Sequence, residues 1–427
     1  MTTPSRLPRV ARAVAGVLGA AALAIAVPAS APAATVDANG DPITNRAGVV
    51  FGVSAHRGGM AEWPENSLEA YTRSAAAGFD AIETDMVFTS DGHPVMSHSD
   101  VLPQRCTNAG EAIHTMTLEQ VRLVRCADLA GAMVVPIPTF EQLAAVLADH
   151  PGVGLHLEVK SYPGQPASGK RLWAKRAITQ VIDHQLLART KLTSFYWDQA
   201  LPVFRAYAPK VRVLALDKDP MDLDRVRLAD RLGADAYGTR MKYTSVYLAE
   251  YVASLCMESA PWNITDAEQR AFRIHLASRS VLLGSDTPTA TRAELVGGLI
   301  DLDPVPTLRA TTLAAPVTVS DITYRAGRKY YKRVGTNAVP TADLALLDDV
   351  TLAITVRGGT GKGSLFVGPS SSPSSASVKV ALPRGTRVLT VKAPLGDNRK
   401  LRISTTATVK LTVRVTGYQR MRFPSAG

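Results

Sequence analysis

Two carboxylates in one apolar run are the residues best placed for chemistry. Glu83 and Asp85 lie two positions apart within Ala81–Phe88. Residues two apart in an extended strand point to the same face, so both carboxylates project together. Neighbouring carboxylates repel each other unless a cation or a proton lies between them, and unpaired buried charges are costly. The pattern predicts a metal site on this strand.

Two histidines lie close to this run. His56 follows the apolar residues 49–55, and His98 follows a short run after the turn at Asp91-Gly92. If that second run is an extended strand, His98 and Asp100 share a face. A single histidine at a strand end is more often structural. Two of them beside carboxylates favour an acid–base pair, because imidazole titrates near neutral pH.

Four motifs in this stretch together resemble the glycerophosphodiester phosphodiesterase family. They are His-Arg-Gly at 56–58, Pro-Glu-Asn at 64–66, Glu-x-Asp at 83–85 and His-x-Asp at 98–100. Each motif is weak alone, but all four occur in the family's order with similar spacing. The resemblance covers about residues 49–288. It implies a (β/α)8 barrel that hydrolyses glycerophosphodiesters to glycerol 3-phosphate and an alcohol.

The resemblance also implies that Glu83, Asp85 and Glu158 bind the metal. Glu158 lies in a Leu-Glu-x-Lys motif in another apolar run, 153–159. Oxygen-only ligands favour Ca²⁺ or Mg²⁺ over Zn²⁺, and the sequence does not choose between the two. A solvated acidic rim is the alternative interpretation. Glu65 is a further candidate, either as a ligand or as a group that supports the ligands.

Cations beside this cluster are expected to bind the phosphate. Arg57 offers a planar, permanent charge, although a surface salt bridge is its alternative role. Lys160 points the same way as Glu158 and could neutralise the phosphate. The resemblance gives His56 and His98 the acid and base roles, with His98 as the acid that protonates the leaving alcohol.

Three later segments resemble other parts of the family's site. Thr193-Ser194-Phe195 resembles a Ser-Phe strand end. Trp262 lies in a looser version of a segment whose indole walls the glycerol pocket, and a place in the barrel core is the alternative. Asp286 lies in a closing motif, where a capping or structural role is as plausible as a functional one.

Short apolar runs alternate with amphipathic segments from about residue 49 to 288, which is typical of parallel βα units in an α/β fold. About eight units over some 250 residues fit a (β/α)8 TIM barrel. Residues 101–136 form a long connection, predicted as either a lid over the catalytic face or a surface loop. Strands are expected at 49–56, 81–88, 93–98, 153–159, 191–197, 211–216, 235–239, 259–264 and 281–286, and helices at 65–77, 139–150, 168–186, 199–208, 221–232, 245–256 and 266–277.

The pattern changes after about residue 304. The runs 350–356 and 409–415 alternate strictly between apolar and polar residues, and Gly- and Ser-rich breaks lie between them. This favours strands with one buried face in a small all-β, sandwich-like domain. The sequence is therefore divided into a barrel domain, 35–304, and a C-terminal domain, 305–427.

Residues 1–34 have the features of a secretory signal peptide. Three arginines precede an apolar run at 13–27, and small-residue cleavage sites follow it. A membrane anchor is the alternative, but the run is short for a span. Export would let a disulfide persist, and Cys106 and Cys126 are the candidate pair. Cys256 is expected to be a buried free thiol.

The formal net charge of +11 is unevenly distributed. The C-terminal domain has 19 basic and 5 acidic residues, which gives +14, whereas the barrel domain carries −6 and residues 1–34 carry +3. An anionic surface, such as wall teichoic acid or acidic lipid, is therefore a candidate partner of the C-terminal domain. A soluble stability module is the alternative. We expect a monomer with no nucleic-acid partner.

The sequence thus predicts a secreted, metal-dependent glycerophosphodiester phosphodiesterase. A competing enzymatic interpretation is a phospholipase D or sphingomyelinase D-like protein that acts on intact lipids. The Pro-Glu-Asn and Leu-Glu-x-Lys motifs argue against it. A competing interpretation of another class is a wall-binding module with a vestigial barrel, against which the full set of expected catalytic residues argues.

Overall fold

The computed structural model describes residues 35–218, 222–277, 281–335, 337–339, 347–369, 377–395 and 400–423. The expected signal peptide, residues 1–34, lies outside these ranges. Within them, no helix is both long and apolar enough to cross a membrane.

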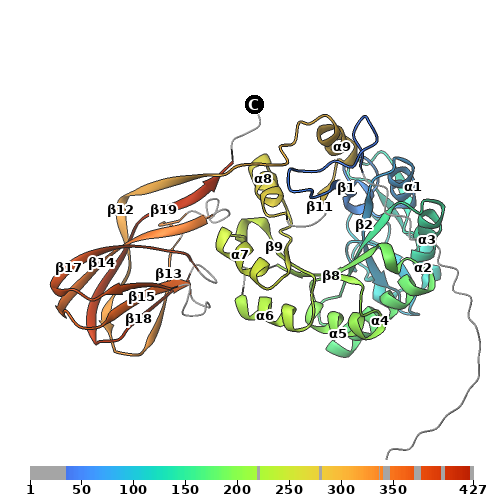
Figure 1. Cartoon of the computed structure of the whole chain (residues 1–427). Coiled ribbons are helices and arrows are strands. Elements are labelled where there is room, and N and C mark those ends of the chain that lie inside the picture. Colours follow the sequence, from blue (N-terminus) through green and yellow to red (C-terminus); the bar gives the residue numbers. More distant parts are fainter. Residues whose placement is uncertain are drawn as a thin grey trace, which may run out of the picture. The chain divides into compact units, whose positions relative to one another are not determined.

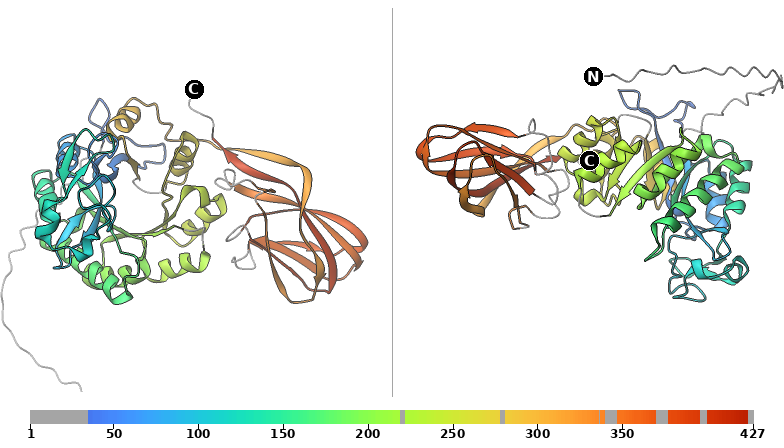
Figure 2. Two further views of the ribbon diagram at one scale, coloured as in Figure 1. Left: turned by 180° about the vertical axis from the view of Figure 1, so that it is seen from behind. Right: turned by 90° about the horizontal axis from the view of Figure 1, so that it is seen from below.

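Eight parallel strands with helices around them form the predicted (β/α)8 barrel (Figure 1 and Figure 2). Hydrogen-bonded neighbours follow the order β10-β9-β8-β7-β6-β2-β1-β11, and no ladder between described residues joins β10 to β11. The strands are β1 (Phe51–Ala55), β2 (Ala81–Phe88), β6 (Gly154–Val159), β7 (Thr190–Ser194), β8 (Arg212–Asp217), β9 (Ala236–Thr239), β10 (Glu258–Ser259) and β11 (Val281–Ser285).

The helices cover the outside of these strands, and their apolar faces explain why. In α3 the buried residues Phe140, Leu143 and Leu147 recur at helical spacing, and Thr139 and Gln142 form a capping box at its start. The described helices are α1 (Leu68–Ala76), α2 (Leu118–Leu123), α3 (Phe140–Asp149), α4 (Ala167–Asp183), α5 (Trp197–Tyr207), α6 (Leu223–Arg231), α7 (Val246–Ser254), α8 (Ala267–His275) and α9 (Pro288–Val296). Neither α2 nor α9 was among the expected helices.

A buried carboxylate fixes the start of the barrel. Asp80 accepts hydrogen bonds from the backbone N–H groups of Thr35, at 2.6 Å, and Val53, at 2.8 Å. Gly52 leaves room for this carboxylate, because a Cβ there would lie only 2.4 Å from its carboxyl carbon. The segment before β1 is thereby joined to the residue that precedes β2.

The run predicted as a strand at 93–98 is not part of the parallel set. Only Pro94–Met96 forms a strand, β3, and it pairs antiparallel with β2 so that Met96 lies opposite Met86. Gly92 takes a φ of +89° in the intervening turn. The chain leaves the strand after Met96, which matters for the residues that follow it.

The long connection at 101–136 contains the predicted disulfide, between Cys106 and Cys126. It also contains α2 and a small antiparallel ladder of β4 (Arg125–Ala127) and β5 (Val134–Pro136). The prediction for Cys256 was wrong, because this free thiol is exposed. It lies just after α7 ends, at a φ of +59°, and so leaves the buried face of that helix.

The C-terminal residues form two four-stranded antiparallel sheets, ordered β12-β19-β14-β17 and β13-β18-β15-β16. Buried aliphatic side chains from both sheets, such as Ile354, Val413 and Ile403, make one core between them, as in a sandwich. The strands are β12 (Thr307–Tyr324), β13 (Lys329–Arg333), β14 (Leu347–Thr360), β15 (Ser364–Pro369), β16 (Val378–Ala381), β17 (Arg384–Ala393), β18 (Lys400–Thr405) and β19 (Val409–Arg422).

Candidate active site

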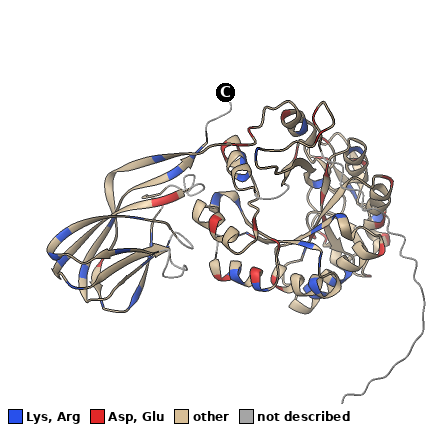
Figure 3. Ribbon diagram, viewed as in Figure 1, with Lys and Arg blue, Asp and Glu red and all other residues tan. Residues whose placement is uncertain are grey.

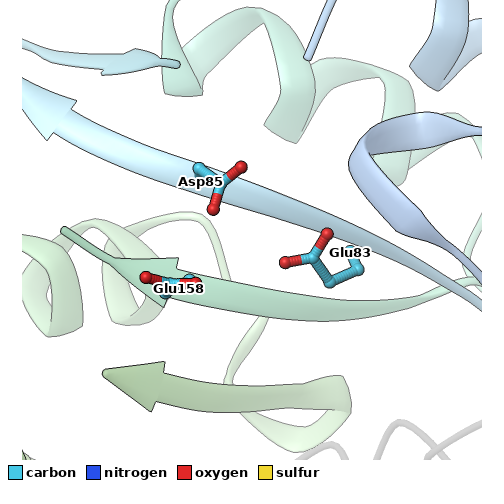
Figure 4. Close-up of side chains that lie close together, drawn as sticks. All are labelled: Glu83, Asp85 and Glu158. Atoms are coloured by element: carbon cyan, nitrogen blue, oxygen red, sulfur yellow. The ribbon is translucent and has the colours of Figure 1, made fainter. Parts of the chain in front are cut away.

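Three carboxylates from two neighbouring strands form the centre of the site (Figure 4). Glu83 and Asp85 project from β2, and Glu158 projects from β6, where it is the register partner of Asp85. One carboxylate oxygen of each lies within 4.8 Å of the others. Asp85 and Glu158 are buried, at 1% and 7% exposure. The period-two spacing on β2 and the parallel register with β6 therefore bring together the three residues predicted as ligands.

Lys160 is the main counter-charge to this cluster. Its Nζ lies 2.8 Å from Asp85 Oδ1 and 2.7 Å from Glu158 Oε1. Burial acts to raise the pKa of Asp85, but Lys160 and His98 outweigh it and hold that pKa well below its usual range. Burial and the charge of Asp85 raise the pKa of Glu158 to about 7, and the same two causes raise that of Glu83. One lysine therefore does not compensate the charge of three clustered carboxylates.

Arg57 lies beside the cluster, held by Glu65. Its Nη1 donates to Glu65 Oε2 at 2.7 Å, and its backbone N–H donates to Glu83 Oε2 at 2.9 Å. Its Nε is buried without a hydrogen-bond partner, 3.7 Å from Asp85 Oδ2. Glu65 also accepts from Arg105 in the 101–136 connection. Glu65 thus orients two arginines, and the long connection contacts the site.

The His-Arg-Gly turn needs glycine for a steric reason. Gly58 has a φ of +79°, a region that side chains rarely adopt. A Cβ there would also lie 2.8 Å from the Cβ of Ala70 in α1. The close packing of this turn on α1 sets the position of His56 and Arg57.

His56 is held between two carboxylates. Its Nδ1 donates to Asp286 Oδ1 at 2.5 Å, and its Nε2 lies 3.8 Å from Glu83 Oε2. Burial lowers the pKa of His56, but Glu83 and Asp286 outweigh it and raise the pKa above its ordinary value. With Nδ1 engaged, Nε2 is the nitrogen that faces the carboxylate cluster.

His98 lies close enough to the cluster to interact with its charges. Burial, together with the positive charge of Lys160, lowers the pKa of His98 to about 4, so its imidazole is neutral at pH 7. The expectation that Asp100 shares its face was wrong, because the strand ends at Met96. Asp100 instead accepts from the backbone N–H and the Nδ1 of His114, at 3.0 and 2.7 Å.

Trp262 and Phe195 form a second, apolar part of the barrel interior. Their rings meet edge to face, with centroids 5.3 Å apart, and both pack against the buried Leu214 and Leu216. The indole Nε1 donates to the backbone oxygen of Asp217 at 3.2 Å. Among the described residues, Trp262 makes no hydrogen bond to the three carboxylates, so its assignment to a substrate pocket stays a prediction.

Sequence reasoning gave Asn66 no role in the site and left the role of Asp286 open. Asn66 donates to Asp85 Oδ2 at 3.0 Å and accepts from Thr84 Oγ1 at 2.8 Å, which fixes the amide against the carboxylate. Asp286 orients His56, a role that had been left open against a structural one. Both residues lie in recognised motifs, so the motifs were the available signal for them.

The donor set fits a hard divalent cation. All three clustered groups are carboxylates, two of them have raised pKa values, and no sulfur ligand is among them. Ca²⁺ and Mg²⁺ prefer such oxygen donors. A cation here would relieve the repulsion that Lys160 leaves uncompensated.

The fold and these side chains define the chain as a (β/α)8-barrel protein with a carboxylate cluster on β2 and β6 and a histidine just after β1. Residues 56–280 match the model of the glycerophosphoryl diester phosphodiesterase family, and the chain belongs to this family.

Individual relatives match shorter segments. The chain is 32% identical over 118 residues to the glycerophosphodiester phosphodiesterase of Caldanaerobacter subterraneus subsp. tengcongensis, a match that covers 26% of this chain and 48% of that protein. It is 23% identical over 175 residues to that of Bacillus altitudinis, covering 39% of this chain and 66% of that protein. The matches thus span about half to two thirds of these relatives.

The fold has a counterpart among solved structures. A candidate glycerophosphoryl diester phosphodiesterase from Silicibacter pomeroyi DSS-3 superimposes with a TM-score of 0.51 and 21% sequence identity. The superposition covers 60% of this chain and 95% of that one. At this identity the likeness supports the barrel fold alone.

Proposed function

We propose that the protein hydrolyses glycerophosphodiesters to glycerol 3-phosphate and an alcohol, with one divalent cation bound by Glu83, Asp85 and Glu158. The single observation that carries this proposal is that a carboxylate-oriented histidine, His56, lies beside a cluster of three carboxylates, with Nε2 3.8 Å from Glu83 Oε2. Membership of the family and the names of the relatives support the substrate class.

The basic side chains at the cluster would bind the phosphate. The buried Nε of Arg57 is a donor without a partner, which suits a phosphate oxygen. Lys160 would contribute charge from the other side of the cluster. When bound, Ca²⁺ or Mg²⁺ would hold the phosphate and lower the pKa of the attacking group. That group is either water, or the neighbouring glycerol hydroxyl, whose attack would give a cyclic phosphate that water then opens to glycerol 3-phosphate.

The two histidines would divide the proton transfers. His56 has Nδ1 bonded to Asp286, so Nε2 is free to take a proton beside the carboxylates, as in other carboxylate-oriented histidines. His98 would give a proton to the leaving alcohol. Its pKa of about 4 must rise for this role, and the negative charge of a bound phosphate acts in that direction.

We also propose that residues 1–34 export the protein and that its basic C-terminal domain binds an anionic surface. The apolar run after three arginines supports export, and the domain's 19 basic against 5 acidic residues support the second proposal. Cell fractionation with and without deletion of residues 1–34 tests export. Retention of the deletion variant inside the cell is the expected result.

The activity is tested by release of glycerol 3-phosphate from glycerophosphocholine by residues 35–427, with Ca²⁺, Mg²⁺ or EDTA. Metal-dependent release is expected, and the variant Glu83→Ala/Asp85→Ala should lose at least about a thousandfold in kcat, because bound metal contributes several kcal/mol to such reactions. Release that is unaffected by EDTA would contradict the metal proposal. Activity on intact sphingomyelin but not on glycerophosphocholine would favour the lipid-directed alternative.

A further inference from the structure

One outer face of the C-terminal domain combines basic and aromatic side chains. In β18 the residues Leu401 and Ile403 are buried in the core, so Lys400 and Arg402 point away from it. The register of the other strands in the sheet β13-β18-β15-β16 places further residues on the same side. We call this surface the aromatic–basic face. It consists of Lys329, Tyr331, Arg333, Phe366, Lys379, Lys400 and Arg402.

Like charges lie directly opposite each other on this face. Arg333 and Lys400 are register partners on β13 and β18, and both are exposed. Within the part of the chain that the structure describes, no carboxylate lies within 4.0 Å of either, nor of Lys329 or Lys379. Like charges in register destabilise a sheet. Among the described residues no carboxylate pairs with these four cations, so an external anion would provide the missing counter-charge.

Two aromatic rings lie among these cations. Tyr331 is 53% exposed and is the register partner of Arg402. Phe366 lies on β15, with Lys379 Nζ 5.9 Å from its ring centroid. Arg402 also donates to Ser377 Oγ at 2.8 Å, which holds its guanidinium at the edge of the sheet. Flat rings beside fixed cations suit a ligand that alternates carbon-rich units with negative charges.

The opposite outer face of the domain differs in kind. It also has a pair of cations in register, Arg357 and Lys410. Its other outward residues are largely threonines, an aspartate lies among them, Asp321, and its described strands present no aromatic ring outward. Its Lys392 donates to Gln419 at 2.9 Å. Lys and Arg thus lie on strands of both sheets (Figure 3). Among the described residues, only the aromatic–basic face adds outward aromatic rings, those of Tyr331 and Phe366.

We propose that the aromatic–basic face binds a linear polyanion of phosphodiester-linked polyol units. The cations would meet the phosphates, and Tyr331 and Phe366 the polyol carbons. The inference rests on the proposed function to the extent that the barrel would act on phosphodiesters of the same chemistry. A membrane is less suited, because this face has no large aliphatic side chain to insert. Single-stranded nucleic acid needs several exposed rings on which successive bases stack. This face offers only the half-exposed ring of Tyr331 and the less exposed ring of Phe366.

The test is binding of residues 35–427 to immobilised poly(glycerol phosphate). The variant Glu83→Ala/Asp85→Ala serves as background, so that the polymer stays intact. Within it, Arg333→Gln/Lys400→Gln and Tyr331→Ser alter the aromatic–basic face. The matched control Arg357→Gln/Lys410→Gln removes the same charge from the opposite face. We expect the affinity for the polymer to fall roughly thirtyfold in Arg333→Gln/Lys400→Gln and less than about threefold in the control. Tyr331→Ser should weaken binding without any change of charge.

Three results would overturn the proposal. They are equal losses in the two charge variants, no binding at low ionic strength, and tighter binding to phosphatidylglycerol vesicles or to an oligothymidylate than to the polymer. Turnover of glycerophosphocholine is measured separately, with Glu83 and Asp85 intact. Polymer binding without turnover would leave this inference standing and contradict the proposed function, and turnover without binding would do the reverse.

Discussion

The protein places like charges opposite each other both in its barrel and in its C-terminal domain, with different consequences. Asp85 and Glu158 are register partners on β2 and β6 inside the barrel. Arg333 and Lys400 are register partners on β13 and β18 at the surface of the C-terminal domain. The acidic pair is buried and shares Lys160, whereas the basic pair is exposed and has no carboxylate within 4.0 Å among the described residues.

Burial explains the difference. Repulsion between charges is strong where water is excluded, so the barrel must supply a lysine and, on our proposal, a divalent cation. Water and salt screen the exposed pair, so the sheet tolerates it without a partner. A like-charge pair inside a protein therefore requires an opposite charge from the fold or from a bound ion. A like-charge pair on the surface does not require one, but it can attract a ligand of opposite charge.

The largest expected effect concerns the histidine beside the acidic pair. His56→Asn should lower kcat by about 10²–10⁴-fold, because it removes a proton-transfer group. Asp286→Asn should keep the ring but weaken its orientation, and lower kcat by a smaller factor of about 10–100. Initial rates on glycerophosphocholine measure both. Equal losses in the two variants would show that Asp286 does more than orient His56.

Replacing the shared lysine tests the acidic pair directly. Lys160→Met should lower the free energy of unfolding by about 3–5 kcal/mol, because it removes the cation that contacts both buried carboxylates of the pair. Urea denaturation measures it, and millimolar Ca²⁺ or Mg²⁺ should restore part of the loss. Lys329→Met, at the surface, should change stability by less than about 0.5 kcal/mol.

The loss in Lys160→Met should depend on pH. The folded-state pKa of Glu158, about 7 with Lys160 present, lies above its ordinary value. The folded state therefore binds more protons than the unfolded state, and the contribution of Glu158 to stability falls as pH rises through 7. Removing Lys160 raises that pKa further. The destabilisation should thus be largest above pH 7 and shrink in acid, together with the metal rescue. A loss independent of pH would contradict this account.

The disulfide should contribute less than the buried charges. Cys106→Ser/Cys126→Ser opens a loop of 20 residues and should lower the free energy of unfolding by about 3 kcal/mol. Because Arg105 contacts Glu65, kcat should also fall severalfold. The exposed free thiol provides the control, and Cys256→Ser should leave both quantities unchanged. Intact activity in the double variant would show that the connection does not position Glu65.

Local pattern was enough to predict part of the site. Glu83 and Asp85 share a face because β2 is a regular strand, where the period of two holds. The same rule failed for Asp100, since the chain turns away after Met96 and nothing in the local sequence marks that point. The prediction that Cys256 is buried was wrong for a similar reason, because the helix before it ends two residues earlier.

Contacts between distant segments could be reached only through motifs. The register that sets Glu158 beside Asp85 depends on how β6 lines up with β2, which no local pattern encodes. The contact of His56 with Asp286 joins residues 230 apart. The two-sheet arrangement of the C-terminal domain was predicted from the alternation of apolar and polar residues. That alternation could not predict the register that puts Arg333 opposite Lys400, because the register depends on how β13 pairs with a strand far along the chain.

The smallest expected effect is a gain in stability rather than a loss. It distinguishes the exposed basic pair from the buried acidic pair. Lys400→Thr removes one cation of the exposed pair and adds a residue that strands favour, so stability should rise by about 0.2–1 kcal/mol at low salt. The gain should shrink in 0.5 M NaCl, because salt already screens the repulsion. Lys392→Thr is the control, since Lys392 faces Thr351 across the ladder and has no like charge opposite it. A loss of stability in Lys400→Thr at low salt would mean that Lys400 has a favourable contact within the fold. Lys400 would then not be available to bind an external anion.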